Sequence, residues 1–170
     1  MKTPERFNRA ISALVNAYFT DTLAKGDCNA CAVGNIVAAG YGAKVYKDSL
    51  GVLRCEVENN KWARFFFTHG KRQVIHSYKE LINSPSIVPY FVQLGLENIK
   101  ITGYSIKDLA RIEAAFERNT SIHVKDYPAH TKEQISADQY NGLMAVVDAL
   151  CRIEGIAEVK EYKALFAEAV

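Results

Sequence analysis

The residues of this chain best suited to catalysis, redox chemistry or metal binding are two cysteines in a Cys-x-x-Cys motif, Cys28 and Cys31. Asp27 is a suitable N-cap, so the pattern predicts that both thiols lie in the first turn of a helix ending at Gly40. The positive end of a helix dipole favours thiolate formation, as in redox, metal-binding and nucleophilic cysteines. Two small side chains at this position are also suited to packing against another helix.

Four interpretations of this motif are open. Structural packing needs no further residue and is the one we favour. A thioredoxin-type redox motif normally follows a β-strand, whereas this one follows a predicted helix. A metal site needs two more ligands, for which only isolated residues are available: Cys55, His69, His76 and Cys151. A catalytic nucleophile, Cys28 or Cys31, needs a base, and His69 or His76 is a candidate for that role.

A second candidate site is the stretch 61–79, in which basic and aromatic residues alternate without any acid. Such a pattern on a β-surface can stack bases and hold phosphates, through Arg64, Lys71 and Arg72 here. The alternative is that the aromatic side chains cover the core and the basic turn is solvated surface. Nucleic-acid binding is therefore an alternative that we do not favour.

Other familiar sites are missing from the sequence. Gly40-Tyr41-Gly42 continues neither as a dinucleotide-binding glycine motif nor as a Walker sequence. The histidines lack metal-ligand spacing, and the cysteines are too few and scattered for an iron–sulfur site. Glu113 and Glu117 lie four residues apart but alternate with arginines, which predicts a charged, solvated helix face. We therefore expect no metal and no cofactor.

Composition places the chain in an ordinary class. Its 170 residues fit one domain, with 49% hydrophobic and 24% charged residues, and a net charge of +2 does not indicate a polyanion partner. No uncharged apolar window approaches the ~18 residues of a membrane span, so we expect no membrane partner. The N-terminus leads into an amphipathic pattern rather than the apolar core of a signal peptide, which predicts a cytoplasmic protein with reduced cysteines.

The elements that would position the motif begin with a helix capped by Thr3, with Pro4 at its first position and Lys25-Gly26 at its end. Its apolar residues recur at helical spacing: Phe7, Ile11, Leu14, Val15, Tyr18, Phe19 and Leu23. The Cys-x-x-Cys helix follows almost at once, so a helical hairpin is expected over 3–40.

The hydrophobic period changes to alternation in a β element over 44–76. Two predicted strands, 52–58 and 61–67, flank Asn59-Asn60, which suits a two-residue hairpin turn. In that register Trp62 lies on the buried face of the hairpin.

The remainder, 77–170, is predicted to be mainly helical. Two capping boxes begin helices there: Ser105 with Asp108, and Thr131 with Gln134. The second helix ends at Gly155, and a last helix is expected around 159–166. Gly142 inside the long helix predicts a close approach by the first helix or the Cys-x-x-Cys helix. The fold class predicted for the single domain 1–170 is mainly α (α+β), with about five or six helices and a small antiparallel β-hairpin near the middle.

Three segments carry a resemblance. They are Cys31-Ala32-Val33-Gly34-Asn35, then Gly103-Tyr104-Ser105 with Ile112-Glu113 and Phe116, and then Asn141-Gly142-Leu143 with Ala145-Val146. Together they resemble a group of small uncharacterised bacterial and phage proteins of about this length. Some members are named as a component of the sodium-translocating NADH-quinone reductase. That activity needs a ferredoxin-type run of cysteines, a flavin domain and a membrane anchor, which this sequence does not show, so the resemblance implies no activity.

The function that the sequence favours is a cytoplasmic, non-enzymatic binding or accessory protein, with a protein as one partner class. Two alternatives from other classes stay open. One is a cysteine-dependent hydrolase or transferase that uses Cys28 or Cys31. The other is a nucleic-acid-binding module that uses the stretch 61–79.

Overall fold

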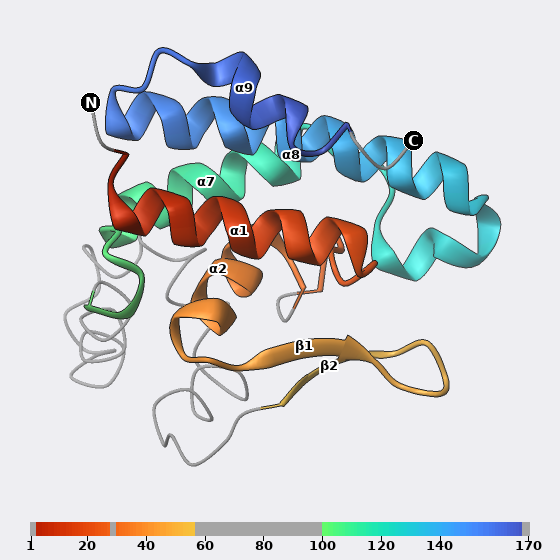
Figure 1. Cartoon of the computed structure of the whole chain (residues 1–170). Coiled ribbons are helices and arrows are strands. Elements are labelled where there is room, and N and C mark those ends of the chain that lie inside the picture. Colours follow the sequence, from red (N-terminus) through yellow and green to blue (C-terminus); the bar gives the residue numbers. More distant parts are fainter. Residues whose placement is uncertain (1–2, 28–29, 57–99, 168–170) are drawn as a thin grey trace, which may run out of the picture.

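The computed structural model describes residues 3–27, 30–56 and 100–167. The elements in these ranges are α1 (Glu5–Phe19), α2 (Ala32–Gly40), β1 (Lys44–Lys47), β2 (Leu53–Glu56), α7 (Ile106–Arg118), the 3-10 helix η2 (Val124–Ala129), α8 (Lys132–Glu154) and α9 (Val159–Ala164). Figure 1 shows α8 packed with α1 and α7, the three longest helices among the described residues, with α9 beyond α8 and with α2 and the β-hairpin on the opposite side. The fold is therefore mainly α with a small antiparallel hairpin, as predicted.

The core lies where the apolar stripes of α1, α2, α7 and α8 meet. Fully buried side chains come from all four helices and from the residues after α9: Phe7, Leu14, Val33, Ile112, Phe116, Leu143, Leu150 and Phe166. Burial of a side chain of this size contributes about 1.5–3 kcal/mol. The predicted stripe of α1 is thus confirmed, except at Phe19, which is 43% exposed.

The predicted starts of α7 and α8 are confirmed in detail. The Ser105 hydroxyl accepts a hydrogen bond from the Asp108 amide (3.1 Å). The Thr131 hydroxyl accepts one from the Gln134 amide (3.2 Å), and the Gln134 side chain accepts one from the Thr131 amide (2.8 Å). Gly155 then ends α8 in the left-handed conformation, with φ at 68°. Local capping chemistry therefore sets the limits of the longest helix.

The helix α1 ends at Phe19, well before the predicted end at Lys25-Gly26. The Thr20 hydroxyl donates to the carbonyl of Asn16 (2.8 Å), and Asp21 adopts a left-handed backbone with φ at 58°. Short polar side chains offer the backbone such alternatives to the helix. The predicted end was therefore wrong because these polar residues stop the helix first.

The N-caps of α1 and α2 also differ from the prediction. The N-cap of α1 is Pro4 rather than Thr3. The N-cap of α2 is Cys31 rather than Asp27. Before α2, the carbonyl of Asp27 accepts hydrogen bonds from the amides of Ala30 (2.9 Å) and Cys31 (2.8 Å), so the chain makes a turn there instead of starting the helix.

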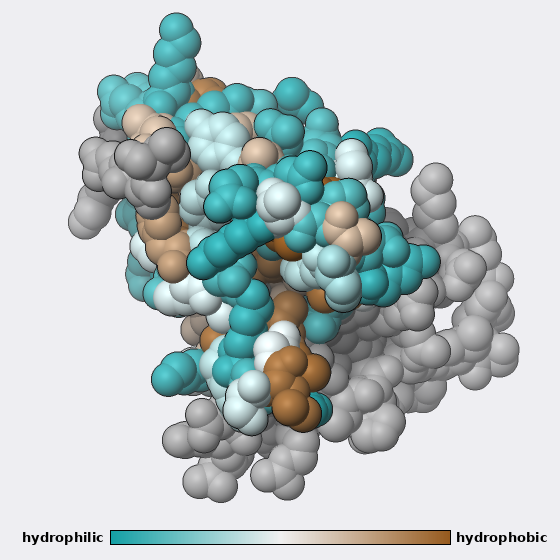
Figure 2. Space-filling view, turned by 90° about the vertical axis from the view of Figure 1, so that its right-hand side faces the viewer, coloured by the Kyte–Doolittle hydropathy of each residue, from teal (hydrophilic) through white to brown (hydrophobic). Residues whose placement is uncertain are grey.

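The strands β1 and β2 pair antiparallel, with Lys44 opposite Glu56 and Lys47 opposite Leu53. The Asp48 carboxylate organises their turn by accepting hydrogen bonds from the amides of Leu50 and Val52 (2.9 Å each), and these bonds lower the pKa of Asp48. Figure 2 faces the tip of this hairpin and shows hydrophobic surface there, where Leu50 is 83% exposed.

This observed pairing of β2 with β1 was not predicted. The predicted turn at Asn59-Asn60, the strand 61–67 with Trp62, and most of the stretch 77–100 lie outside the described residues.

Candidate functional site

Among the predicted nucleophiles, bases and anion-binding residues, Cys31 is the one that the structure describes. The others lie outside the described ranges: Cys28, Arg64, His69, Lys71, Arg72 and His76. Their predicted roles stay predictions.

Cys31 serves as the N-cap of α2 and is only 3% exposed. Its sulfur accepts a hydrogen bond from the amide of Gly34 (3.3 Å), so it satisfies one of the unpaired amides at the start of the helix. The thiol therefore stands one position outside the first turn, packed into the core.

A buried carboxylate lies at the same helix end. Glu113 of α7 accepts a hydrogen bond from the amide of Val33 (3.2 Å) and is 3% exposed. The positive end of α2 stabilises a carboxylate in this place. The predicted solvated face was thus wrong for Glu113. Its position between Ile112 and Phe116, in step with the apolar stripe of α7, was the signal that pointed to burial.

Two further polar side chains hold the loop that precedes α2. The Asn35 amide lies within hydrogen-bond distance of three carbonyls, those of Thr22 (3.3 Å), Ala30 (3.0 Å) and Cys31 (3.1 Å). The Lys25 ammonium donates to the carbonyl of Glu117 (2.6 Å) near the end of α7 and to that of Thr120 just beyond it. A cation at a helix C-terminus complements the dipole there. The start of α2 is therefore a closed, hydrogen-bonded junction.

The described part of the chain contains no group of three or more His, Cys, Asp or Glu side chains that could hold a metal ion. No described helix is long and apolar enough to cross a membrane. Cys151, in α8, is a buried free cysteine. Burial, and after it the charge of Asp148, raises the pKa of the Cys151 thiol, which disfavours its reactive form.

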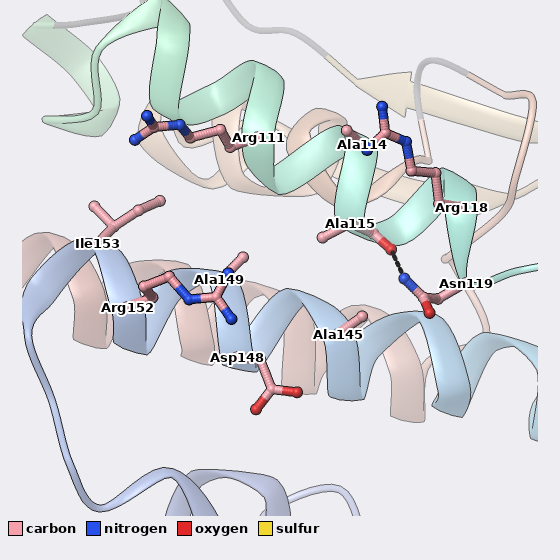
Figure 3. A pocket seen from close by; sticks show the side chains of 10 residues that line it. All are labelled: Arg111, Ala114, Ala115, Arg118, Asn119, Ala145, Asp148, Ala149, Arg152 and Ile153. Carbon is pink, nitrogen blue, oxygen red and sulfur yellow. Dashed lines mark hydrogen bonds between the residues drawn. The ribbon is translucent and has the colours of Figure 1, made fainter.

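An open groove of about 630 Å³ lies between α7 and α8 on the molecular surface (Figure 3). Arg111 and Arg118 of α7 and Arg152 of α8 line it, together with Asn119 and Asp148. The apolar lining is small: Ala114, Ala115, Ala145, Ala149 and Ile153. We call this feature the arginine groove.

The arginine groove carries excess positive charge. Arg111 pairs with Asp108 (3.3 Å), whereas Arg118 and Arg152 are exposed and form no ion pair with any described residue. Asp148 is the single acid among the lining residues. It points away from α7 in Figure 3 and pairs with Lys163 (2.8 Å).

Sequence reasoning missed this groove because acids and arginines alternate along α7. The fold separates them. Glu113 is buried against α2, and Glu117 lies 4.0 Å from the ammonium of Lys25. The arginines Arg111 and Arg118 are therefore left on the other side of the helix without these neutralising partners.

A second cavity of about 510 Å³ lies between α1, α2 and β1. Alanines and short polar side chains line it together with the residues of β1, and Lys47 of this lining forms an ion pair with Asp21. Neither of the two cavities is lined by Cys31.

The described geometry supports binding chemistry at the arginine groove. Guanidinium groups form two parallel hydrogen bonds with carboxylates or phosphates and are more easily desolvated than ammonium groups. At the start of α2, by contrast, the described polar groups bind one another. Comparisons of the chain with protein-family models, with curated proteins and with solved structures found no match.

Proposed function

We propose that this chain is a cytoplasmic, non-enzymatic binding or accessory protein that recognises an anionic partner through the arginine groove. The observation that carries the proposal is the exposure of Arg118 and Arg152 beside a hollow surface, with no ion pair to another described residue. Arginine is enriched at binding interfaces, where it supplies much of the affinity. The free thiol of Cys151 is typical of a reducing compartment.

The second candidate is the cysteine-dependent enzyme. A nucleophile has to reach its substrate, and it needs a base within hydrogen-bond distance. Cys31 is 3% exposed and its sulfur accepts the Gly34 amide, which supports a structural role instead. The candidate bases His69 and His76 lie outside the described residues, so this function stays the alternative.

A binding experiment with a charged polymer tests the proposed function. Fluorescein-labelled poly-L-glutamate is titrated with the full chain, and anisotropy is measured at low and at physiological salt. We expect binding that weakens about tenfold in Arg118→Glu, since a favourable charge contact becomes a repulsive one. The control is Lys125→Glu, which makes the same charge change at an exposed residue of η2 away from the groove.

Either of two results contradicts the proposal. One is that poly-L-glutamate does not bind, and the other is that Arg118→Glu and Lys125→Glu weaken binding equally, since the groove then makes no specific contribution. Circular dichroism of each variant verifies that the helices are retained.

A further inference from the structure

We propose that the partner of the arginine groove is an amphipathic α-helix of another protein, with acidic residues two turns apart on one face. This inference rests on the proposed function, because it names the class of the anionic partner.

The first argument is the spread of the three guanidinium groups. In Figure 3, Arg111 and Arg118 stand at opposite ends of the groove, and Arg152 extends along α8 at the end where Arg111 lies. Arg118 lies seven positions after Arg111, which corresponds to two turns and about 10.5 Å along α7. A single small anion cannot bind both of these side chains, so the groove fits an extended partner with several charges.

The second argument is the match between this spacing and a helix. Side chains at positions i and i+7 of a helix lie on one face, two turns apart, with i+3 and i+4 between them. Acids at i and i+7 therefore repeat the spacing of Arg111 and Arg118. Arg152 lies on α8 at the Arg111 end of the groove, so acids in the first turn of the partner helix face both of these arginines. Charge complementarity thus favours a helix with an acidic stripe.

The third argument is the shape of the groove. Its apolar lining consists of four alanines and Ile153, so the floor of the groove is formed mainly by small side chains. Packed helices lie about 8–10 Å apart, and small residues at the contact allow the lower end of that range. A third helix can therefore seat a narrow apolar edge between the two helices, as in the helix-in-groove mode of recognition.

Nucleic acid fits the same surface less well. Single strands bind through bases stacked on aromatic side chains, together with cations along the backbone. The lining residues of the arginine groove include no aromatic side chain. The groove therefore lacks the platform that this class of partner uses.

The test uses a fluorescein-labelled peptide of about 18 residues, long enough for five helical turns. It carries Glu at i, i+3 and i+7, with Ala and Leu along the adjoining edge. The control peptide has the same composition in scrambled order. We expect the full chain to bind the amphipathic peptide about tenfold more tightly than the scrambled one. Arg118→Glu and Arg152→Glu should each abolish most of this preference for the amphipathic peptide, whereas Lys125→Glu should leave the preference unchanged.

A variant in the apolar lining separates this inference from the proposed function. Ala149→Gln fills the groove without changing its charge or adding a poor helix former. We expect weaker binding of the amphipathic peptide, by about fivefold or more, and unchanged binding of poly-L-glutamate. If poly-L-glutamate binds through Arg118 but the two peptides bind alike, the helix is the wrong class while the proposed function stands. If neither polymer nor peptide binds, both are wrong.

Two further measurements test the other possible partners of the arginine groove, which are nucleic acid and a second copy of this chain. Arg118-dependent binding of a duplex DNA of about 20 base pairs, with a steep salt dependence and no preference for the amphipathic peptide, overturns the inference in favour of nucleic acid. Sedimentation that shows a dimer of this chain, lost in Arg118→Glu, overturns it in favour of a second copy. A variant that loses its helical circular dichroism is replaced by the milder Arg118→Gln, for which the same ranking of the two peptides is the criterion.

Discussion

Gly142 of α8 lies against Thr120, the residue that follows the C-cap of α7. A Cβ atom at Gly142 would stand 2.5 Å from Cγ2 of Thr120 and 2.7 Å from a ring carbon of Phe116, closer than such atoms approach. The sequence predicted that another backbone crosses closely at Gly142; the approach is close, but the nearest atoms belong to the side chains of Thr120 and Phe116. The prediction assigned the approach to the first helix or the Cys-x-x-Cys helix, which was wrong, because α7 and the residue after it provide the contact.

Gly142→Ala should therefore lower the free energy of unfolding by about 1–3 kcal/mol, although alanine is the better helix former. The buried neighbours have little room to move. Urea unfolding measures the change. In a Thr120→Ser background the nearest methyl group is gone, while the hydroxyl can still donate to the carbonyl of Phe116 (2.9 Å), so the cost should shrink. Unchanged or raised stability of Gly142→Ala alone contradicts the argument.

Cys31 allows a comparison of two substitutions. Cys31→Ala should cost about 1 kcal/mol, since the N-cap acceptor of α2 and a little buried volume are lost. Cys31→Ser should cost less, because a hydroxyl accepts the Gly34 amide well. Thermal unfolding ranks the variants. Equal losses for alanine and serine contradict the capping role.

The same burial predicts slow modification of the Cys31 thiol. Iodoacetamide at pH 6, followed by intact mass and peptide mapping, should label Cys31 much more slowly in the folded protein than in urea. Fast and selective labelling of folded Cys31 would make the cysteine-dependent enzyme the leading function.

Lys25 joins the N-terminal loop to the end of α7. Lys25→Met should lower the free energy of unfolding by about 1–3 kcal/mol, because the carbonyls of Glu117 and Thr120 lose a charged donor. Lys125→Met is the control, since Lys125 is exposed and should change stability by less than about 0.5 kcal/mol. Denaturant unfolding of both variants checks the difference, and equal effects would show that the Lys25 contacts are energetically neutral.

Tyr104 makes stability depend on alkaline pH. Burial, and after it the negative charge of Glu154, raises the pKa of Tyr104 above its ordinary value of 10.0. Above that pH the unfolded chain releases this proton and the folded protein does not, so stability is full below pH 10 and falls as pH rises. One such group lowers the free energy of unfolding by up to about 1.4 kcal/mol per pH unit.

Tyr104→Phe should remove the contribution of Tyr104 to the fall of the unfolding free energy with pH. It should keep the Arg6 guanidinium over the ring, which lies 4.7 Å from the ring centroid in the natural chain. Urea unfolding between pH 8 and 11 measures it. Burial also raises the pKa of Tyr127, so a smaller slope should remain. Identical pH dependence in the variant and the natural chain would contradict the assignment to Tyr104.

The parts of the fold that could be predicted are those that local chemistry decides. The Thr131 and Gln134 side chains and Gly155 set the limits of α8 through contacts within a few residues. The apolar stripes could be predicted because apolar residues recur at helical spacing along the sequence. The end of α1 was within reach as well, because the short polar side chains Thr20, Asp21 and Thr22 compete with the helix backbone.

The candidate site could not be predicted in the same way, because contacts between distant segments create it. The N-cap of α2 is Cys31 rather than Asp27, because the Asn35 amide lies within hydrogen-bond distance of carbonyls from the preceding loop. The arginine groove exists because Glu113 is buried against α2 and no longer offsets its basic neighbours on α7. No spacing rule along the sequence expresses either relationship.

The contact between Glu113 and Val33 also has a consequence for synthesis on the ribosome. The two residues are 80 positions apart, and Lys25 reaches its acceptors at Glu117 and Thr120 across 92 and 95 positions. Closing loops of this length is slow and entropically costly, whereas α7 and α8 are joined by a short connection. The helices α1 and α2 are also joined by a short connection and can pack on each other early. Their contacts with α7, by contrast, have to wait until residues 113–120 have left the ribosome.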